Sequence, residues 1–264
     1  ELKVAPGVLI PRPETELLVE LTIDHIQSSD KQTPKIIDLG TGSGAIGLAL
    51  AKNLPNAQVT CVDVSAEALK IAQENARLLN LNSVKFLQSN WFDGLTTNLP
   101  SEDGVFDVIV SNPPYIRAGD HHLSMGDLRF EPSSALTDDH DGLMAYRAIF
   151  KEASAYLAEA GFILVEHGFD QSKEVCQLLQ EQNYINIKAH QATVGGLGLE
   201  GGIGRIDAKA QFLVFLGQRG AGGHAESQCG KGQQCFFHYS IPKNQYERLW
   251  RRIIVTGTRT TYRK

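Results

Sequence analysis

The sequence has few cysteines and no long apolar run, and these absences narrow the class of protein. Its four cysteines include no CxxC pair, so they form no disulfide framework, and a reducing cytoplasm is the expected compartment. No apolar stretch reaches the roughly 18–20 residues that cross a bilayer, and no secretory signal opens the chain, so we expect no membrane partner. The chain begins at Glu1 without a methionine, and we expect a further segment ahead of it.

Positive charge is scarce in most of the chain and concentrated at its end. Residues 218–264 carry nine Lys or Arg against two Asp or Glu, a net +7, whereas residues 1–217 carry 16 against 28, a net −12. The acidic body argues against a broad nucleic-acid surface on it. We predict one domain over residues 1–217 and a basic, glycine-rich tail of unknown role over residues 218–264.

Short apolar strands alternate with amphipathic helices along most of the chain. Strands are expected at residues 35–40, 57–64, 84–88, 106–111, 161–168, 184–190 and 210–217. Helices are expected at residues 13–28, 45–54, 65–80, 142–159 and 170–182. Ser65 is the expected N-cap of the third helix. Several strands are apolar at almost every position, as in a parallel sheet covered on both faces, so the pattern predicts a doubly wound α/β fold.

A glycine-rich turn joins the first strand to the next helix. The segment DLGTGSGAIG (38–47) lets the backbone approach a ligand beside a helix N-terminus with free N–H groups. Asp63, at the tip of the second strand, is placed to face the ribose hydroxyls of a nucleotide-like cofactor. The spacing Gly42-x-Gly44-x-x-Gly47 also fits the dinucleotide fingerprint, so a dinucleotide and a purely structural turn both stay open at this point.

The fourth strand ends in a stiff loop, Asn112-Pro113-Pro114-Tyr115. The two prolines remove two backbone donors and fix two φ angles. An –NH₂ group on a substrate can donate one hydrogen to the Asn112 side-chain oxygen and the other to the Pro113 carbonyl. Tyr115 can form a wall beside a flat substrate group or stack on it. The loop contains no acid or base, which favours a methyl group on a sulfonium as the electrophile. A simple turn capped by asparagine is the structural alternative.

At these residues the chain resembles the S-adenosylmethionine-dependent methyltransferases with an (N/D/S)PP(Y/F/W) signature. More narrowly, it resembles the protein-(glutamine-N5) methyltransferases of peptide chain release factors, the HemK/PrmC family. The resemblance covers about residues 5–217. Its motifs are LIPRPETE (9–16), DLGTGSGAIGLALA (38–51), VDVSAEAL (62–69), QSNWF (88–92), SNPPYI (111–116), DLRFEPSSAL (127–136) and GFILVEHG (161–168).

The resemblance implies a seven-stranded, Rossmann-like class I methyltransferase fold with strand order 3-2-1-4-5-7-6 and the last strand antiparallel. It implies S-adenosylmethionine as cofactor, S-adenosylhomocysteine as product, and the glutamine of the Gly-Gly-Gln motif in a class 1 release factor as substrate. The implied cofactor-binding residues are Gly40, Thr41, Gly42, Ser43, Gly44, Asp63, Trp91 and Asn112. The implied substrate-binding residues are Asn112, Pro113, Pro114 and Tyr115, of which Asn112, Pro113 and Tyr115 form the catalytic group.

The chain departs from this family at Asn90, where the family usually has an aspartate, so a pure acceptor becomes a mixed donor and acceptor. Three other functions stay open: glutamine methylation of a large-subunit ribosomal protein, N6-adenine methylation of nucleic acid, and cofactor binding without catalysis. The net negative charge of residues 1–217 argues against methylation of nucleic acid.

Several further charged and soft side chains, within the motifs and in the tail, are candidates for site residues. Arg12 could gate the entrance or hold a carboxylate. The four carboxylates near the motifs are expected to be solvated or structural: Glu14, Glu16, Asp93 and Glu131. The tail has a possible set of zinc ligands whose spacing fits no familiar finger, so no metal is predicted: His224, Cys229, Cys235 and His238.

Overall fold

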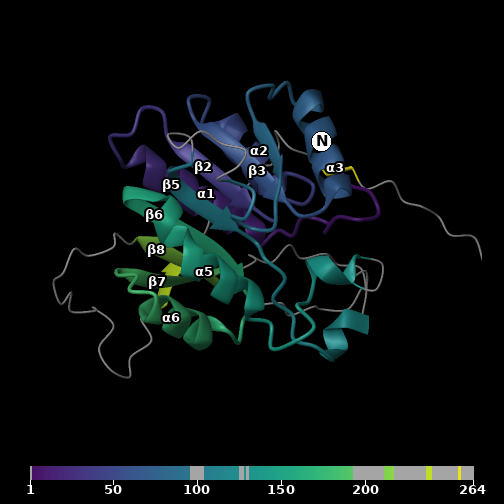
Figure 1. Ribbon diagram of the computed structural model, residues 1–264, viewed down its shortest axis with the longest axis vertical. Helices are drawn as coiled ribbons and strands as arrows, with labels where there is room; N and C mark the ends of the chain where they lie inside the picture. The colour runs from purple at the N-terminus through teal and green to yellow at the C-terminus, as the bar shows by residue number, and fades with distance from the viewer. Residues whose placement is uncertain are drawn as a thin grey trace, which may run out of the picture.

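The computed structural model describes residues 2–95, 104–121, 123, 128 and 131–190, and the backbone of residues 122, 124, 191–192, 211–216, 236–239 and 255–256. Within these residues an eight-stranded sheet lies between helices on both faces (Figure 1). Its strands are β2 (Lys35–Leu39), β3 (Gln58–Asp63), β4 (Lys85–Gln88), β5 (Phe106–Ser111), β6 (Leu157–His167), β7 (Ile187–Ala192), β8 (Gln211–Leu216) and β9 (Phe236–Tyr239). The helices are α1 (Thr15–Gln27), α2 (Ala45–Asn53), α3 (Ala66–Leu78), α5 (Met144–Tyr156) and α6 (Ser172–Glu181), with 3₁₀ turns η1 (His121–Ser124) and η3 (Ser133–Ala135).

The strand order is β4-β3-β2-β5-β6-β8-β7-β9. The first seven confirm the predicted order, and β8 is antiparallel to both β6 and β7, as predicted. The tail adds β9, which is parallel to β7, and β10 (Val255–Thr256), which pairs with β1 (Leu2–Lys3). These two strands were not predicted, and the domain boundary at residue 217 stays a prediction.

Alternate residues of the central strands belong to two separate hydrophobic cores. Ile36 of β2 and Val108 of β5 pack with α1 and α2, whereas Ile37 and Ile109 pack with α5 and α6. Side chains of a strand point alternately to opposite faces, so covering both faces requires the nearly continuous apolar strands seen in the sequence. In the part of the chain that the structure describes, no helix combines the length and apolarity needed to cross a bilayer.

Helices and strands begin and end where local chemistry favours it. Ser65 is confirmed as the N-cap of α3, because its Oγ accepts a hydrogen bond from the Ala68 N–H at 3.2 Å. The strand predicted at 184–190 begins only at Ile187, since Asn183 and Asn186 adopt left-handed φ values of 61° and 58°. Strand β6 starts four residues before the predicted Gly161.

The register of the parallel strands gathers four chain segments at one edge of the sheet. Leu39 pairs with Ser111, and Ser111 pairs in turn with Val165. The next residue of each strand therefore emerges beside its neighbours, which brings the glycine turn, Asn112 and Glu166 together. This carboxyl edge is where open α/β sheets bind ligands.

Candidate active site

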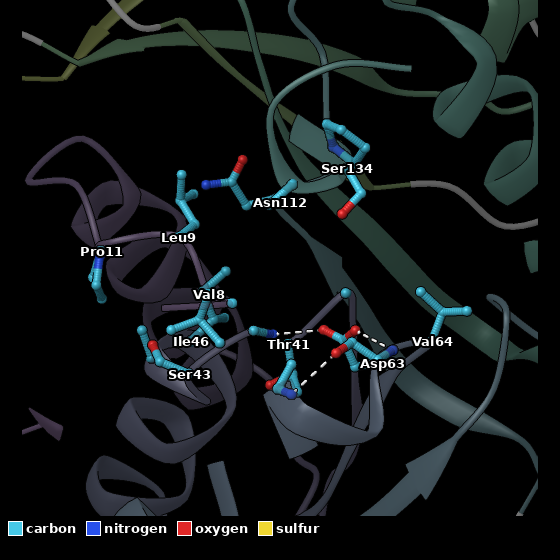
Figure 2. Close-up of a pocket in the computed structure, with 18 of the residues that line it drawn as sticks. Val8, Leu9, Pro11, Thr41, Ser43, Ile46, Asp63, Val64, Asn112 and Ser134 are labelled. Carbon is cyan, nitrogen blue, oxygen red and sulfur yellow. Dashed lines mark hydrogen bonds between the residues drawn. The ribbon is translucent and has the colours of Figure 1, made fainter. Parts of the chain in front are cut away.

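A pocket opens at the carboxyl edge of β2, β3 and β5 (Figure 2). It is lined by seven of the eight predicted cofactor residues: Gly40, Thr41, Gly42, Ser43, Asp63, Trp91 and Asn112. Pro114 also lines the pocket, whereas Pro113 and Tyr115 lie outside its lining. The remaining lining comes from the segment ahead of α1 and its first residue Thr15, from the starts of α2 and α3, from the residues that follow β3 and β4, and from Ser134 and Ala135 of η3. The LIPRPETE and DLRFEPSSAL motifs therefore both contribute to the cavity.

The glycine turn exposes backbone to this pocket. Gly40 and Gly42 have φ values of 71° and 56°, which only glycine adopts readily. A Cβ on Gly42 would meet nothing within 4 Å, so its backbone faces open space. Gly44 differs, because its Cβ would lie 2.8 Å from Leu48 and 3.2 Å from Ala72, so it packs on helices behind the turn. Its predicted cofactor role stays a prediction.

Asp38 stabilises the glycine turn from within the protein, although it was not among the residues predicted for the site. Asp38 is fully buried, and its Oδ2 accepts from the Thr41 hydroxyl at 2.6 Å and the Gly47 N–H at 2.9 Å. Burial raises the pKa of this carboxyl to about 6. A single acidic residue inside the apolar strand KIIDL was the available signal.

Asp63 closes one side of the pocket through two backbone hydrogen bonds (Figure 2). Its Oδ2 accepts from the Gly42 N–H at 2.8 Å, and its Oδ1 accepts from the Ser65 N–H at 2.9 Å. Each carboxylate oxygen can accept further hydrogens beyond these. The carboxylate therefore ties β3 to the glycine turn and still offers acceptors to hydroxyl groups in the pocket.

Trp91 and Asn90 form the wall beyond β4. The Trp91 ring lies 3.6 Å from where a Cβ on Gly40 would sit, and Trp91 has a left-handed φ of 48°, a conformation that is costly for a bulky residue. The Asn90 Nδ2 donates to Asp93 at 3.0 Å. This bond occupies a donor of Asn90 and leaves its Oδ1 as an acceptor, the capacity that an aspartate would also have.

Asn112 is oriented by a contact from another part of the chain. Its Nδ2 donates to the Thr15 Oγ1 at 3.3 Å. Within the described residues, neither its Oδ1 nor the Pro113 carbonyl receives a hydrogen bond. The two acceptors that the sequence assigned to a substrate –NH₂ group are therefore available. The loop is fixed by Gln171, whose Nε2 donates to the Tyr115 carbonyl at 2.9 Å.

Glu166, at the end of β6, is a second buried carboxylate that sequence reasoning missed. It is 1% exposed, and it accepts from the Thr15 hydroxyl at 2.8 Å and the Tyr115 hydroxyl at 3.2 Å. Burial raises its pKa to about 7. The signal was again an acid at the end of an apolar strand, GFILVEHG. Tyr115 thus points to Glu166 instead of forming a pocket wall.

Two of the other charged candidates, Arg12 and Glu131, are paired with each other. Arg12 holds a carboxylate, as one of the two predictions stated, because its Nη2 lies 2.6 Å from the Glu131 Oε1. This ion pair joins the segment ahead of α1 to Glu131, just before η3. Glu16 is buried in α1 and does not line the pocket.

No metal-binding group occurs among the side chains that the structure describes. The four candidate zinc ligands of the tail are outside that set: His224, Cys229, Cys235 and the side chain of His238.

The chain contains a domain of the methyltransferase class. Residues 30–211 match the family described as "Methyltransferase domain". The catalytic domain of hMettl16, solved with the MAT2A 3'UTR hairpin 1, superposes with a TM-score of 0.59 at 16% identity, covering 81% of this chain and 74% of that one, and supports the fold alone.

Closer relatives define the family. A release factor glutamine methyltransferase of Bordetella pertussis is 43% identical over 75% of this chain and 71% of its own length. A second, of Vibrio cholerae, is 47% identical over 74% of this chain and 65% of its own length. This chain belongs to the release factor glutamine methyltransferase family. It spans about two thirds of the length of such relatives, with 66% of the Aliivibrio fischeri protein covered.

Proposed function

We propose that this protein transfers a methyl group from S-adenosylmethionine to the side-chain amide nitrogen of the glutamine in the Gly-Gly-Gln motif of a class 1 release factor. The observation that carries the proposal is the pair of unengaged acceptors on Asn112 and Pro113, next to a pocket built by the glycine turn and Asp63. Residues 1–217 are the proposed catalytic domain. The cytoplasm, where release factors act, is the proposed compartment.

The pocket residues fit the proposed cofactor. The open backbone at Gly42 gives room for a close-lying ligand, Asp63 offers carboxylate acceptors to ribose hydroxyls, and the Trp91 ring offers a flat face to adenine. S-adenosylmethionine, when bound, supplies an electrophilic methyl group on a cationic sulfonium. These residues lie at or just after the carboxyl ends of β2, β3 and β4, where open α/β sheets bind their ligands.

The proposed chemistry depends on positioning, because an amide nitrogen is a poor nucleophile and, among the residues that the structure describes, no lysine, arginine or histidine lines the pocket. Asn112 Oδ1 and the Pro113 carbonyl would accept the two hydrogens of the substrate –NH₂ group and hold its nitrogen in line with the electrophile. As the nitrogen–methyl bond forms and the sulfonium–methyl bond breaks, the nitrogen would lose one of these hydrogens as a proton to solvent. Holding reacting groups in this way can lower a barrier by ~7–11 kcal/mol. The prolines and Gln171 keep these acceptors rigid.

A methylation assay with three substrates tests the proposal. The protein is incubated with labelled S-adenosylmethionine and, separately, with a class 1 release factor, a large-subunit ribosomal protein and DNA. We expect label on the release factor, at the glutamine of Gly-Gly-Gln in peptide mass spectrometry. Label on the ribosomal protein or on DNA alone would overturn the proposed substrate, and no label on any of the three would overturn the proposed activity.

A further inference from the structure

A buried chain of hydrogen bonds lies behind Asn112 and joins three segments. It runs from the Asn112 Nδ2 to the Thr15 Oγ1 at 3.3 Å and from the Thr15 hydroxyl to the Glu166 Oε2 at 2.8 Å. The Tyr115 hydroxyl donates to the other oxygen of Glu166 at 3.2 Å. Thr15 is 5% exposed and Glu166 is 1% exposed, so solvent does not compete strongly for these bonds.

The donors and acceptors of this hydrogen-bonded network can be arranged in one order only, as a count of their hydrogens shows. An ionised carboxylate only accepts, and a threonine hydroxyl has one hydrogen to donate. Because that hydrogen goes to Glu166, Thr15 can offer Asn112 only a lone pair. Asn112 must therefore turn its –NH₂ group toward Thr15 and keep its oxygen for the pocket. The two ends of an asparagine amide have nearly the same shape, so such a network decides which end faces a ligand.

We infer that Thr15 and Glu166 are positioning residues that lock Asn112 with its amide oxygen toward the substrate, so that the site selects glutamine and rejects the isosteric glutamate. This inference rests on the proposed function. A glutamine presents two hydrogens to the Asn112 Oδ1 and the Pro113 carbonyl. A glutamate carboxylate presents only oxygens, so acceptors would face acceptors. Without the lock, Asn112 could rotate and donate to the carboxylate instead.

The substitution Glu166→Gln reverses the chain with almost no change in shape. The new –NH₂ group can donate to Thr15, the Thr15 hydroxyl can then turn to Asn112, and the Asn112 oxygen can accept from it. The –NH₂ group of Asn112 would then face the pocket. Tyr115 keeps its partner, because the remaining amide oxygen at residue 166 still accepts.

The test compares binding of two release factors, one with the native Gly-Gly-Gln and one with glutamate in place of that glutamine. Affinities are measured by calorimetric titration in the presence of S-adenosylhomocysteine, at about pH 8.5 so that Glu166 is ionised. For the unaltered protein we expect the glutamate form to bind at least ~100-fold more weakly. In Glu166→Gln the ratio of the two dissociation constants, glutamate form over glutamine form, should fall at least ~10-fold.

A second set of variants keeps the test decisive if Glu166→Gln does not fold. Thr15→Val removes the hydroxyl and should lower the ratio similarly, whereas Thr15→Ser should restore it. Thr22→Val is the matched control on the same helix, because Thr22 is also buried and its hydroxyl donates to the Leu18 carbonyl at 2.7 Å, away from Asn112 and Glu166. We expect the control to leave the ratio unchanged.

Two results separate the inference from the function on which it rests. If the unaltered protein methylates the release factor but the ratio is the same in Glu166→Gln, Thr15→Val and the unaltered protein, the inference alone is overturned. If the unaltered protein methylates no release factor, the proposed function fails and the inference fails with it. A ratio that falls in Glu166→Gln, or that falls in Thr15→Val and is kept in Thr15→Ser, supports the inference.

Discussion

At the scale of single residues, the site depends on a few side chains whose hydrogens leave little choice of orientation. The motifs around Asn112 and Asp63 could be read from the sequence, because their residue types and order are unusual. The contact between Thr15 and Glu166 could not be read, since 151 positions separate the two residues and only the folded sheet brings them together. The groups that face the pocket were therefore predictable from the sequence, whereas the groups that orient them were not.

Removing the Asp63 carboxylate should weaken cofactor binding. In Asp63→Ala the pocket loses the acceptors proposed for ribose, and the Gly42 and Ser65 N–H groups lose their partner. Charged hydrogen bonds are each worth about 1.5–3 kcal/mol, so Kd for S-adenosylhomocysteine should rise at least ~10-fold. Calorimetric titration measures this change, and an unchanged Kd would refute the ribose role.

The ionisation of Glu166 should control turnover near neutral pH. Burial, and then the charge of Glu14, raise its pKa to about 7, while hydrogen bonds from Thr15 and Tyr115 and the charge of Arg12 act in the opposite sense. A protonated carboxyl can donate to Thr15, so the Thr15 hydroxyl can donate to Asn112 and the orientation of the Asn112 amide is no longer fixed. We expect kcat/KM to fall as the pH drops through about 7. The same acidic limb in Glu166→Gln would show that another group causes it.

At the scale of helices and strands, apolar periodicity located most elements to within a few residues. Its errors fall where the backbone adopts a left-handed conformation at an ordinary residue, as at Ala160 inside β6 and at Asn186 before β7. Such conformations depend on tertiary pairing and leave no periodic trace. The register that gathers the site at one edge followed from the parallel order alone.

The junction of β2, β3 and α2 leaves no space at Gly47. A Cβ there would collide with the Cys61 Sγ and lie 3.1 Å from the Asp38 Oδ2. We expect Gly47→Ala to lower the free energy of unfolding by ~1–3 kcal/mol, as overpacking usually does. Urea denaturation measures the loss. In a Cys61→Ala background, which removes the colliding sulfur, the loss should be smaller, and equal losses in both backgrounds would rule out this steric cause.

At the scale of the whole molecule, the doubly wound fold and its strand order were predictable, but the strands contributed by the tail were not. Composition separates residues 218–264 from the body, yet β9 and β10 pair with β7 and β1. The fold also contains several carboxyls whose pKa is raised by burial: Glu16, Glu20, Asp38 and Glu166. These groups couple the stability of the molecule to pH.

The buried Glu16 should make the protein less stable in alkaline solution. Burial, with the charges of Glu20 and Glu14, raises its pKa from 4.5 to about 8. Between these values the unfolded chain has lost a proton that the folded chain keeps, so the free energy of unfolding falls as the pH rises and levels off above about 8. Glu16→Gln should raise Tm at about pH 9 and change it little at about pH 4.

Thermal unfolding at both pH values checks this expectation. The exposed substitution Glu67→Gln is the matched control, and it should leave the difference in Tm between the two pH values unchanged. A difference in Tm that persists in full in Glu16→Gln would show that Glu16 is not the source.

The claim on which the account depends is that Asn112 holds the substrate nitrogen. The most direct measurement is single-turnover methylation of the release factor by Asn112→Ala, together with the Kd for S-adenosylhomocysteine. We expect the methylation rate to fall roughly 10²–10³-fold, as for the loss of one group from a preorganised site, while this Kd changes far less. Methylation by Asn112→Ala at nearly the unaltered rate would contradict the account.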